Sequence, residues 1–273
     1  MDRPAIRLGD VFAAARREER AALFAYIVAG DGGFDASLAS MRAALCAGVD
    51  SLIVAVACRL PVFAPGALYD SYIRAAEGGA TFQTAIGMVK TLQAEGFAAP
   101  FVLSIYASTV FKLTVPKIAA DSRAARVDSI AITGCPTDRS SELTPQLNRH
   151  NVRRMRILDS KARITRSFRI SGEGADLSSL FVLAGADGIE SRIAEIRAVT
   201  SLPLIAETGV ETPADAARAA RFADGVVVWK PLCEAFAGPP ADAPAKIAAS
   251  IAEFRKNISK KSGAVSEPPP EVS

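Results

Sequence analysis

The sequence predicts a single (β/α)8 barrel, and three observations lead to this expectation. Short apolar or β-branched runs alternate along the chain with longer, Ala-rich amphipathic runs, eight times over. The length of 273 residues suits eight strand–helix units. A doubly wound sheet is the alternative, but it would usually carry a Gly-rich phosphate loop after its first strand. Here Gly30-Asp31-Gly32-Gly33 has only the character of a turn.

The strands and helices of this barrel follow from the apolar pattern. Strands are expected over residues 23–29, 50–57, 101–106, 129–133, 153–158, 179–184, 202–206 and 225–229. After an N-terminal helix, further helices are expected over residues 37–47, 81–95, 115–123, 140–149, 189–199, 212–222 and 245–258. The run DSLIVAVA is apolar on both faces, which is typical of a parallel strand covered on both sides. We expect one domain over residues 1–258 and a disordered, Pro/Ser-rich tail over residues 259–273.

Composition excludes several classes of protein. Half of the residues are hydrophobic, which is too many for a disordered chain, and a net charge of +3 does not indicate a polyanion binder. Four cysteines without close spacing and one histidine, His150, argue against a disulfide scaffold, a zinc module and a Ser-His triad. We expect no cofactor or metal. The charged start and the lack of a long apolar run predict a cytoplasmic protein without a signal peptide or membrane helix.

Seven short segments in or near the predicted strands form a distinctive series. They are residues 24–31 (FAYIVAGD), 47–50 (AGVD), 106–111 (YASTVF), 185–188 (GADG), 202–204 (LPL), 208–210 (TGV) and 223–228 (ADGVVV). In their order and spacing these segments resemble the tryptophan synthase alpha subunit. The resemblance runs from about Leu8 to Phe236. It implies a barrel that cleaves indole-3-glycerol phosphate to indole and glyceraldehyde 3-phosphate. It also implies docking on a pyridoxal-phosphate beta subunit through the catalytic rim.

The residues that would perform the family's reaction are replaced. The reaction needs two carboxylates, one at the end of the second strand and one in the following loop. At the matching positions this chain has Ile53 and Ala64, and residues 58–66 contain no acid. The Gly-Ser phosphate pair of the family reads Trp229-Lys230, and the loop after the sixth strand is about six to eight residues shorter. We therefore expect a paralogue without the lyase activity that binds a partner through its apolar loop, residues 60–66.

Two other functions remain open. One is an enzyme with changed chemistry on a small phosphorylated or anionic substrate, with Glu207 as base and Asp187 or Lys230 as further catalytic candidates. The candidates for binding its ligand are Phe24, Arg59, Tyr106, Gly188, Gly209 and Lys230. The other function is the lyase activity of an authentic alpha chain, with the two catalytic carboxylates supplied by residues at positions that do not align with those of the family.

Each candidate also has a plain structural interpretation. Lys230 could form a rim ion pair with Glu207, whereas a Schiff-base role would need a lowered pKa. Three thiols follow predicted strands and could bind a soft metal or act as nucleophiles, but packed apolar positions are the expectation. They are Cys58, Cys135 and Cys233.

The segment from Arg149 to Arg169 is strongly basic, with eight cations and one acid, Asp159. It could attract an anionic ligand or an acidic protein face, or simply be a solvated surface. Its single aromatic residue, Phe168, argues against nucleic acid as the partner. For His150, near the end of a predicted helix, we expect a surface or capping role.

Overall fold

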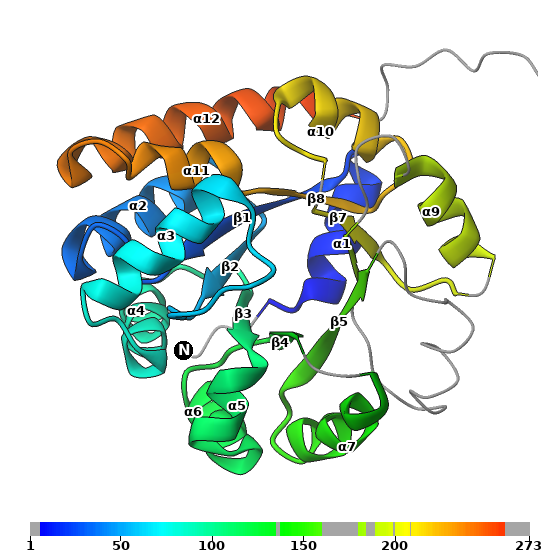
Figure 1. Cartoon of the computed structure of the whole chain (residues 1–273). Coiled ribbons are helices and arrows are strands. Elements are labelled where there is room, and N and C mark those ends of the chain that lie inside the picture. The colour runs from blue at the N-terminus through cyan, green and yellow to red at the C-terminus, as the bar shows by residue number, and fades with distance from the viewer. Residues whose placement is uncertain are drawn as a thin grey trace, which may run out of the picture.

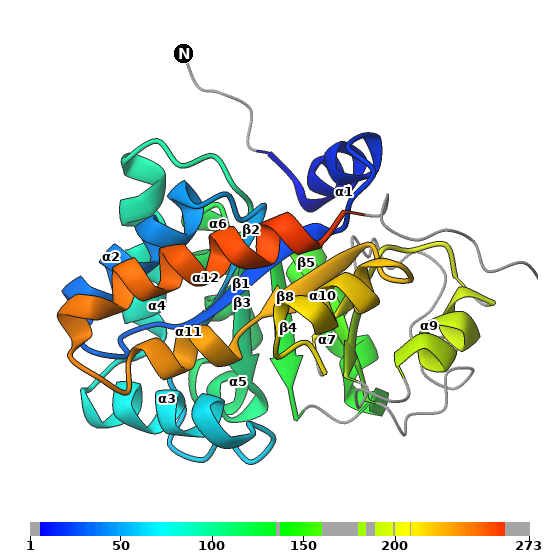
Figure 2. The same ribbon diagram turned by 90° about the horizontal axis from the view of Figure 1, so that it is seen from above.

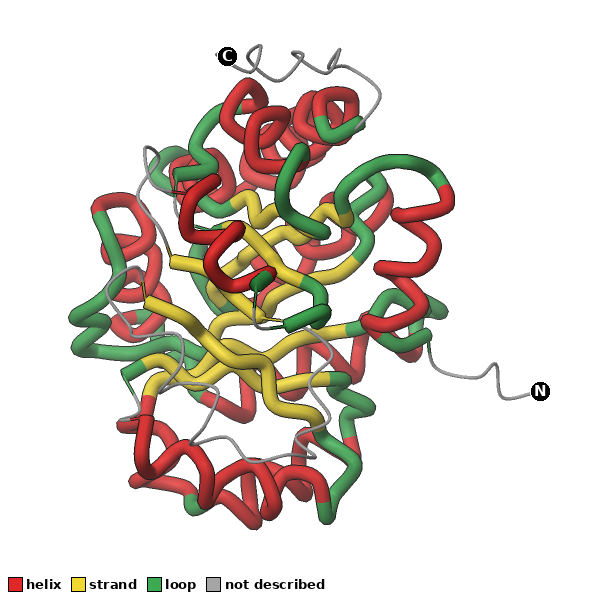
Figure 3. The backbone as a smooth tube through the Cα atoms, turned by 90° about the vertical axis from the view of Figure 1, so that its right-hand side faces the viewer, coloured by secondary structure: helices red, strands yellow, loops and turns green. Residues whose placement is uncertain are grey.

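Eight parallel strands close into a barrel, which confirms the predicted fold class. The computed structural model describes residues 6–134, 137–159, 180–183, 189–198, 200–207 and 209–259. Neighbouring strands pair in sequence order, and β8 pairs with β1 to complete the ring. Figure 1 looks into this ring, with the helices arranged around it. Figure 3 shows the strands from the side, enclosed by the helices.

The elements lie close to the predicted positions. The strands are β1 (Ala22–Val28), β2 (Ser51–Ala55), β3 (Phe101–Tyr106), β4 (Ser129–Thr133), β5 (Arg153–Asp159), β6 (Leu180–Leu183), β7 (Leu204–Ala206) and β8 (Gly225–Val228). The helices are α1 (Leu8–Arg17), α2 (Phe34–Cys46), α3 (Gly66–Glu77), α4 (Phe82–Ala94), α5 (Ala107–Leu113), α6 (Val115–Ala124), α7 (Thr137–Asn148), α9 (Ile189–Arg197), α10 (Pro213–Ala220), α11 (Lys230–Ala235) and α12 (Ala243–Asn257).

Three of these helices were not predicted. α3, α5 and α11 follow the ends of β2, β3 and β8. The predicted eighth strand is one residue too long, because Trp229 forms the N-cap of α11 and Pro231 follows in its first turn. The predicted disordered tail lies outside the described residues from residue 260 onwards, and Ser259 forms an isolated bridge with Arg20.

Alternation along the strands produces two apolar layers. On β1, Phe24 and Tyr26 belong to the cluster inside the barrel, whereas Leu23 and Ala25 belong to the cluster between strands and helices. Helix α1 closes the barrel at the end where the strands begin, with the rings of Phe12 and Phe24 5.9 Å apart. Figure 2 shows α1 at this end. The opposite end, where the strands finish, is the mouth in which barrels of this kind place their function.

A cluster of charged groups holds the closed end together. The Asp50 carboxylate accepts two hydrogen bonds from the Arg20 guanidinium at 2.7 and 2.8 Å and one from Arg255 at 2.8 Å. It also accepts from the Leu23 backbone N–H at 2.7 Å. One carboxylate therefore joins the start of β1, the chain entering β2 and helix α12.

We expect Asp50→Ala to lower the free energy of unfolding by about 3 kcal/mol, because it leaves two guanidinium groups with only the exposed Glu18 as a shared acid. Urea unfolding measures this change. Asp35→Ala, which removes an exposed carboxylate from the first turn of α2, is the matched control and should cost less than about 1 kcal/mol. Equal losses of unfolding free energy in the two variants would show that the charged cluster around Asp50 does not specifically stabilise the closed end of the barrel.

Within the described part of the chain, no helix combines the length and the apolarity that crossing a bilayer requires.

Candidate functional site

Ile53 lies inside the barrel and is fully buried. It is in register with Tyr26 of β1 and Val102 of β3, so β2 directs an aliphatic side chain towards the barrel axis. Ala64 lies further along, in the loop between β2 and α3, where its N–H donates to the carbonyl of Pro61 at 2.9 Å. Neither position can donate or accept a proton through its side chain.

Three tyrosines from three elements meet inside the mouth. The hydroxyls of Tyr26 and Tyr72 are 2.6 Å apart, and the Tyr26 hydroxyl is 2.9 Å from Ser104 Oγ on β3. The rings of Tyr72 and Tyr106 pack edge to face, with centroids 5.5 Å apart. Desolvation raises the pKa of the Tyr106 hydroxyl to about 12, so at neutral pH these groups are uncharged hydrogen-bonding groups. Of this cluster, the sequence singled out only Tyr106 as a ligand candidate.

Glu207 follows β7 and brings a carboxyl group to the tyrosine cluster. Its charge is close enough to raise the pKa of both the Tyr26 and the Tyr106 hydroxyl. Part of the residue reaches solvent, but desolvation around the carboxyl raises its pKa to about 7. A carboxyl group with this pKa can exchange protons at neutral pH, which makes Glu207 the best-placed acid–base group that the structure describes.

This pKa leads to a test of stability against pH. The folded state retains a proton on Glu207 between pH 4.5 and about 7, whereas the unfolded state has lost it. The carboxyl therefore makes the protein progressively less stable as pH rises through this window, by up to about 3 kcal/mol. We expect Glu207→Gln to be less sensitive to pH than the wild type in urea unfolding between pH 5 and 8. Parallel curves for the two proteins would contradict the raised pKa.

Lys230 is held by a different acid from the one predicted. Its Nζ donates to Glu211 Oε2 at 2.5 Å, and both side chains are exposed. The expected pair with Glu207 is therefore wrong, because Lys230 starts α11 on the outside of the barrel while the neighbouring Trp229 turns inward. Glu211 raises the pKa of Lys230, the opposite of what a Schiff-base lysine needs.

The other ligand candidates are dispersed. Phe24 is fully buried against α1, so it packs the closed end and does not reach the mouth. Arg59 is exposed and lines a cavity outside the barrel, beside α3 and α5. Gly209 lies after β7 with φ +83°, a conformation that suits glycine. Asp187 and Gly188 lie outside the described residues.

Two of the three thiols expected in packed positions are described by the structure, and both are packed. Cys58 and Cys233 are both buried, and burial raises the pKa of Cys233 to about 12, which disfavours the thiolate. Cys135 lies outside the described residues. The backbone carbonyl of His150, just beyond α7, accepts from Arg123 at 3.1 Å.

The basic segment is only partly a solvated surface. Arg154 and Arg156 on β5 are buried, which corrects the solvated interpretation for these two residues. Desolvation and the neighbouring Arg154 lower the pKa of Arg156 to about 10. Side chains at alternate strand positions share a face, which brings these two cations together. The part of the segment after Asp159 lies outside the described residues.

The loop after β2 displays large apolar side chains around the mouth. Leu60, Val62 and Phe63 are between 64% and 75% exposed, and Phe111 on α5 is 74% exposed. We call these four residues the rim patch. The Phe63 ring also lies against Gly134 beyond β4, so close that a Cβ there would be 3.0 Å from the ring. The loop thus reaches from β2 towards the end of β4 and presents apolar surface of the kind that marks contact sites.

An ion pair between a buried carboxylate and a half-buried arginine, which the sequence did not reveal, anchors the helix behind this loop. Asp31, after β1, is fully buried and accepts hydrogen bonds from Ser71 and Arg74 of α3. Arg74 also donates to the carbonyl of Cys233 in α11 at 3.2 Å. The end of β1, α3 and α11 are therefore joined beside the mouth. The ion pair spans 43 positions of the chain, so local patterns could not predict it.

The sequence model of the family described as tryptophan synthase alpha chain matches residues 12–261. The chain belongs to this family. The alpha-like barrel superposes on a tryptophan synthase structure from Mycobacterium tuberculosis with a TM-score of 0.84 at 23% identity, covering 94% of this chain and 99% of that one. Tryptophan synthase subunit alpha from Legionella pneumophila gives a TM-score of 0.83 at 19% identity, covering 93% and 99%. These structural likenesses establish the fold, and the family match confirms the resemblance seen in the sequence.

Proposed function

We infer that this tryptophan synthase alpha-like chain does not cleave indole-3-glycerol phosphate and serves as a partner-binding subunit. The observation that carries the first part is the fully buried Ile53 at the position where the family's reaction needs a carboxylate. Ala64 occupies the second such position. The reaction requires a proton at the indole ring carbon while the ring N–H is engaged, and two aliphatic side chains provide neither function.

The second part rests on the rim patch. Its four side chains are exposed around the ends of the adjacent strands β2 and β3. Exposed apolar side chains of this size are costly to leave in water and typically mark a protein interface. The ion pair between the buried Asp31 carboxylate and Arg74 fixes α3 behind the loop, so the loop is attached to a rigid base.

The partner that fits best is a pyridoxal-phosphate beta chain of the tryptophan synthase type. Relatives with this fold are chains of tryptophan synthase, including one described as its subunit alpha. Isothermal titration of this chain with a tryptophan synthase beta chain from the same cell tests the proposal, and saturable binding of one chain per beta chain is expected. The absence of binding at 100 µM of each protein would overturn the partner assignment.

A second candidate function rests on Glu207. Its carboxyl has a pKa of about 7 beside the Tyr26 and Tyr106 hydroxyls, and such a group can act as a general base on a small anionic substrate. A metabolite screen with wild type and Glu207→Gln tests this function. A substrate turned over by the wild type and at least about 100-fold more slowly by the variant would support it.

A further inference from the structure

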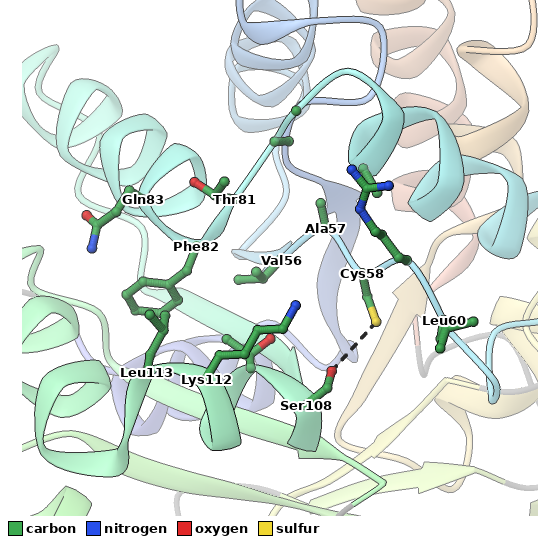
Figure 4. Close-up of a pocket in the computed structure, with 15 residues that line it drawn as sticks. Val56, Ala57, Cys58, Leu60, Thr81, Phe82, Gln83, Ser108, Lys112 and Leu113 are labelled. Carbon is green, nitrogen blue, oxygen red and sulfur yellow. Dashed lines mark hydrogen bonds between the residues drawn. The ribbon is translucent and has the colours of Figure 1, made fainter.

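A cavity separate from the barrel interior lies beside the β2–α3 loop. It has a volume of about 540 Å³ and lies between the end of β2, the turn before α4, and helix α5. Figure 4 shows its wall, with the Cys58 thiol directed at Ser108 Oγ, 3.9 Å away. Space of this size admits a small organic molecule.

The floor of this side cavity is apolar. Val56 and Phe82 are buried there, and Ala76, Ala80 and Leu113 complete the apolar wall. An apolar ligand body would therefore displace water from aliphatic and aromatic surface, which favours binding.

The charged groups that line the cavity are both cations, Arg59 and Lys112. Neither has an ion pair or a side-chain hydrogen bond with the part of the chain that the structure describes. In Figure 4 the Lys112 amine extends from α5 towards Val56 and Cys58, across the hollow. The positively charged Lys112 side chain therefore reaches into the cavity, where it can pair with a negatively charged group of a ligand.

Hydrogen-bonding groups at the edge complete the recognition chemistry. Thr81 is the N-cap of the 13-residue helix α4, whose first residues Phe82 and Gln83 line the cavity. The start of a helix carries partial positive charge, which adds to that of the two cations. The hydroxyls of Ser108 and Thr109 lie on the α5 side.

We propose that this side cavity binds a small amphipathic carboxylate, with a flat apolar body of one or two rings against Phe82 and Val56 and its carboxylate between Arg59 and Lys112. An Arg fork can hold a carboxylate through two hydrogen bonds, and Lys112 adds a second charge. The site borders the rim patch, since Leu60 lines both, but the other three residues of the patch do not line the cavity and the proposed ligand binding does not need the partner.

The test is titration of the purified chain with 2-naphthoate, followed by calorimetry, with neutral 2-naphthamide and inorganic phosphate as comparison ligands. We expect 2-naphthoate to bind at least about tenfold more tightly than 2-naphthamide, because the amide lacks the charge. Arg59→Gln and Lys112→Gln should each weaken binding about tenfold. Arg16→Gln, which removes the same charge from exposed α1, should leave binding unchanged.

A variant that fills the cavity tests the location independently of charge. Thr109→Phe projects a ring from α5 into the space and should abolish 2-naphthoate binding while the melting temperature stays within a few degrees. Failure of 2-naphthoate to bind at 1 mM, or binding unaffected by Thr109→Phe, overturns the proposal. Inorganic phosphate binding as tightly as 2-naphthoate also overturns it, in favour of a simple anion site. Phe63→Asp should leave this binding intact even where it disrupts partner docking.

Discussion

Indole release from indole-3-glycerol phosphate is expected to be at least about 10⁴-fold slower with this chain than with an authentic tryptophan synthase alpha chain. Each general acid or base contributes about 10²- to 10⁴-fold to such a rate, and both positions are aliphatic here. Steady-state assays of both proteins, with and without a beta chain, measure the difference.

The geometry explains why the loss should be so large. Ile53 points into a packed interior, between the neighbours Tyr26 and Val102. The nearby tyrosines are neutral at pH 7, and desolvation raises their pKa values further above neutrality, so they do not replace a carboxylate as base. Glu207 provides one acid–base group, but it follows β7, which lies on the opposite side of β1 from β2. A single carboxyl group cannot both protonate the indole ring carbon and engage the ring N–H. A rate within about tenfold of the authentic enzyme would contradict this explanation.

Replacing the rim patch is expected to weaken beta-chain binding at least about 100-fold. In the double variant Val62→Asp/Phe63→Asp, two exposed apolar side chains become carboxylates that must lose water on docking. Titration calorimetry with the beta chain measures the change. Because both residues are exposed in the free chain, unfolding by urea should shift by less than about 1 kcal/mol.

A matched variant distinguishes this patch from exposed apolar residues in general. Phe222 follows α10, away from the β2 and β3 loops, and is 40% exposed. Phe222→Asp makes the same chemical change and should leave beta-chain affinity within about twofold. If Phe222→Asp weakens binding as much as the double variant, the rim patch is not the docking surface.

Local patterns predicted the barrel because each strand carries its own signal. β2 is an unbroken apolar run, and the turn residues around it mark its limits. The same kind of reasoning could have found two of the missed helices. Leu68, Tyr72 and Ala76 recur at helical spacing in α3, and Pro231 is typical of the first turn of a helix such as α11.

Contacts between distant segments could not be predicted in this way. Lys230 was expected beside Glu207, but the turn after β7 brings Glu211 to it instead. The hydrogen bond between Tyr26 and Tyr72 depends on how α3 packs over the mouth, and the raised pKa of Glu207 depends on desolvation by the folded barrel. Sequence could nominate Glu207 from its place after a strand, whereas only the fold shows its surroundings.

The most direct test of the missing acid–base pair is a single-turnover experiment with protein in excess over indole-3-glycerol phosphate, quenched over time and assayed for indole. The wild type and Glu207→Gln are compared under the same conditions. We predict that both release indole at the uncatalysed rate, because binding alone cannot supply the second proton transfer. A burst of indole from the wild type that disappears in Glu207→Gln would show that a working catalytic site remains, and would contradict the account.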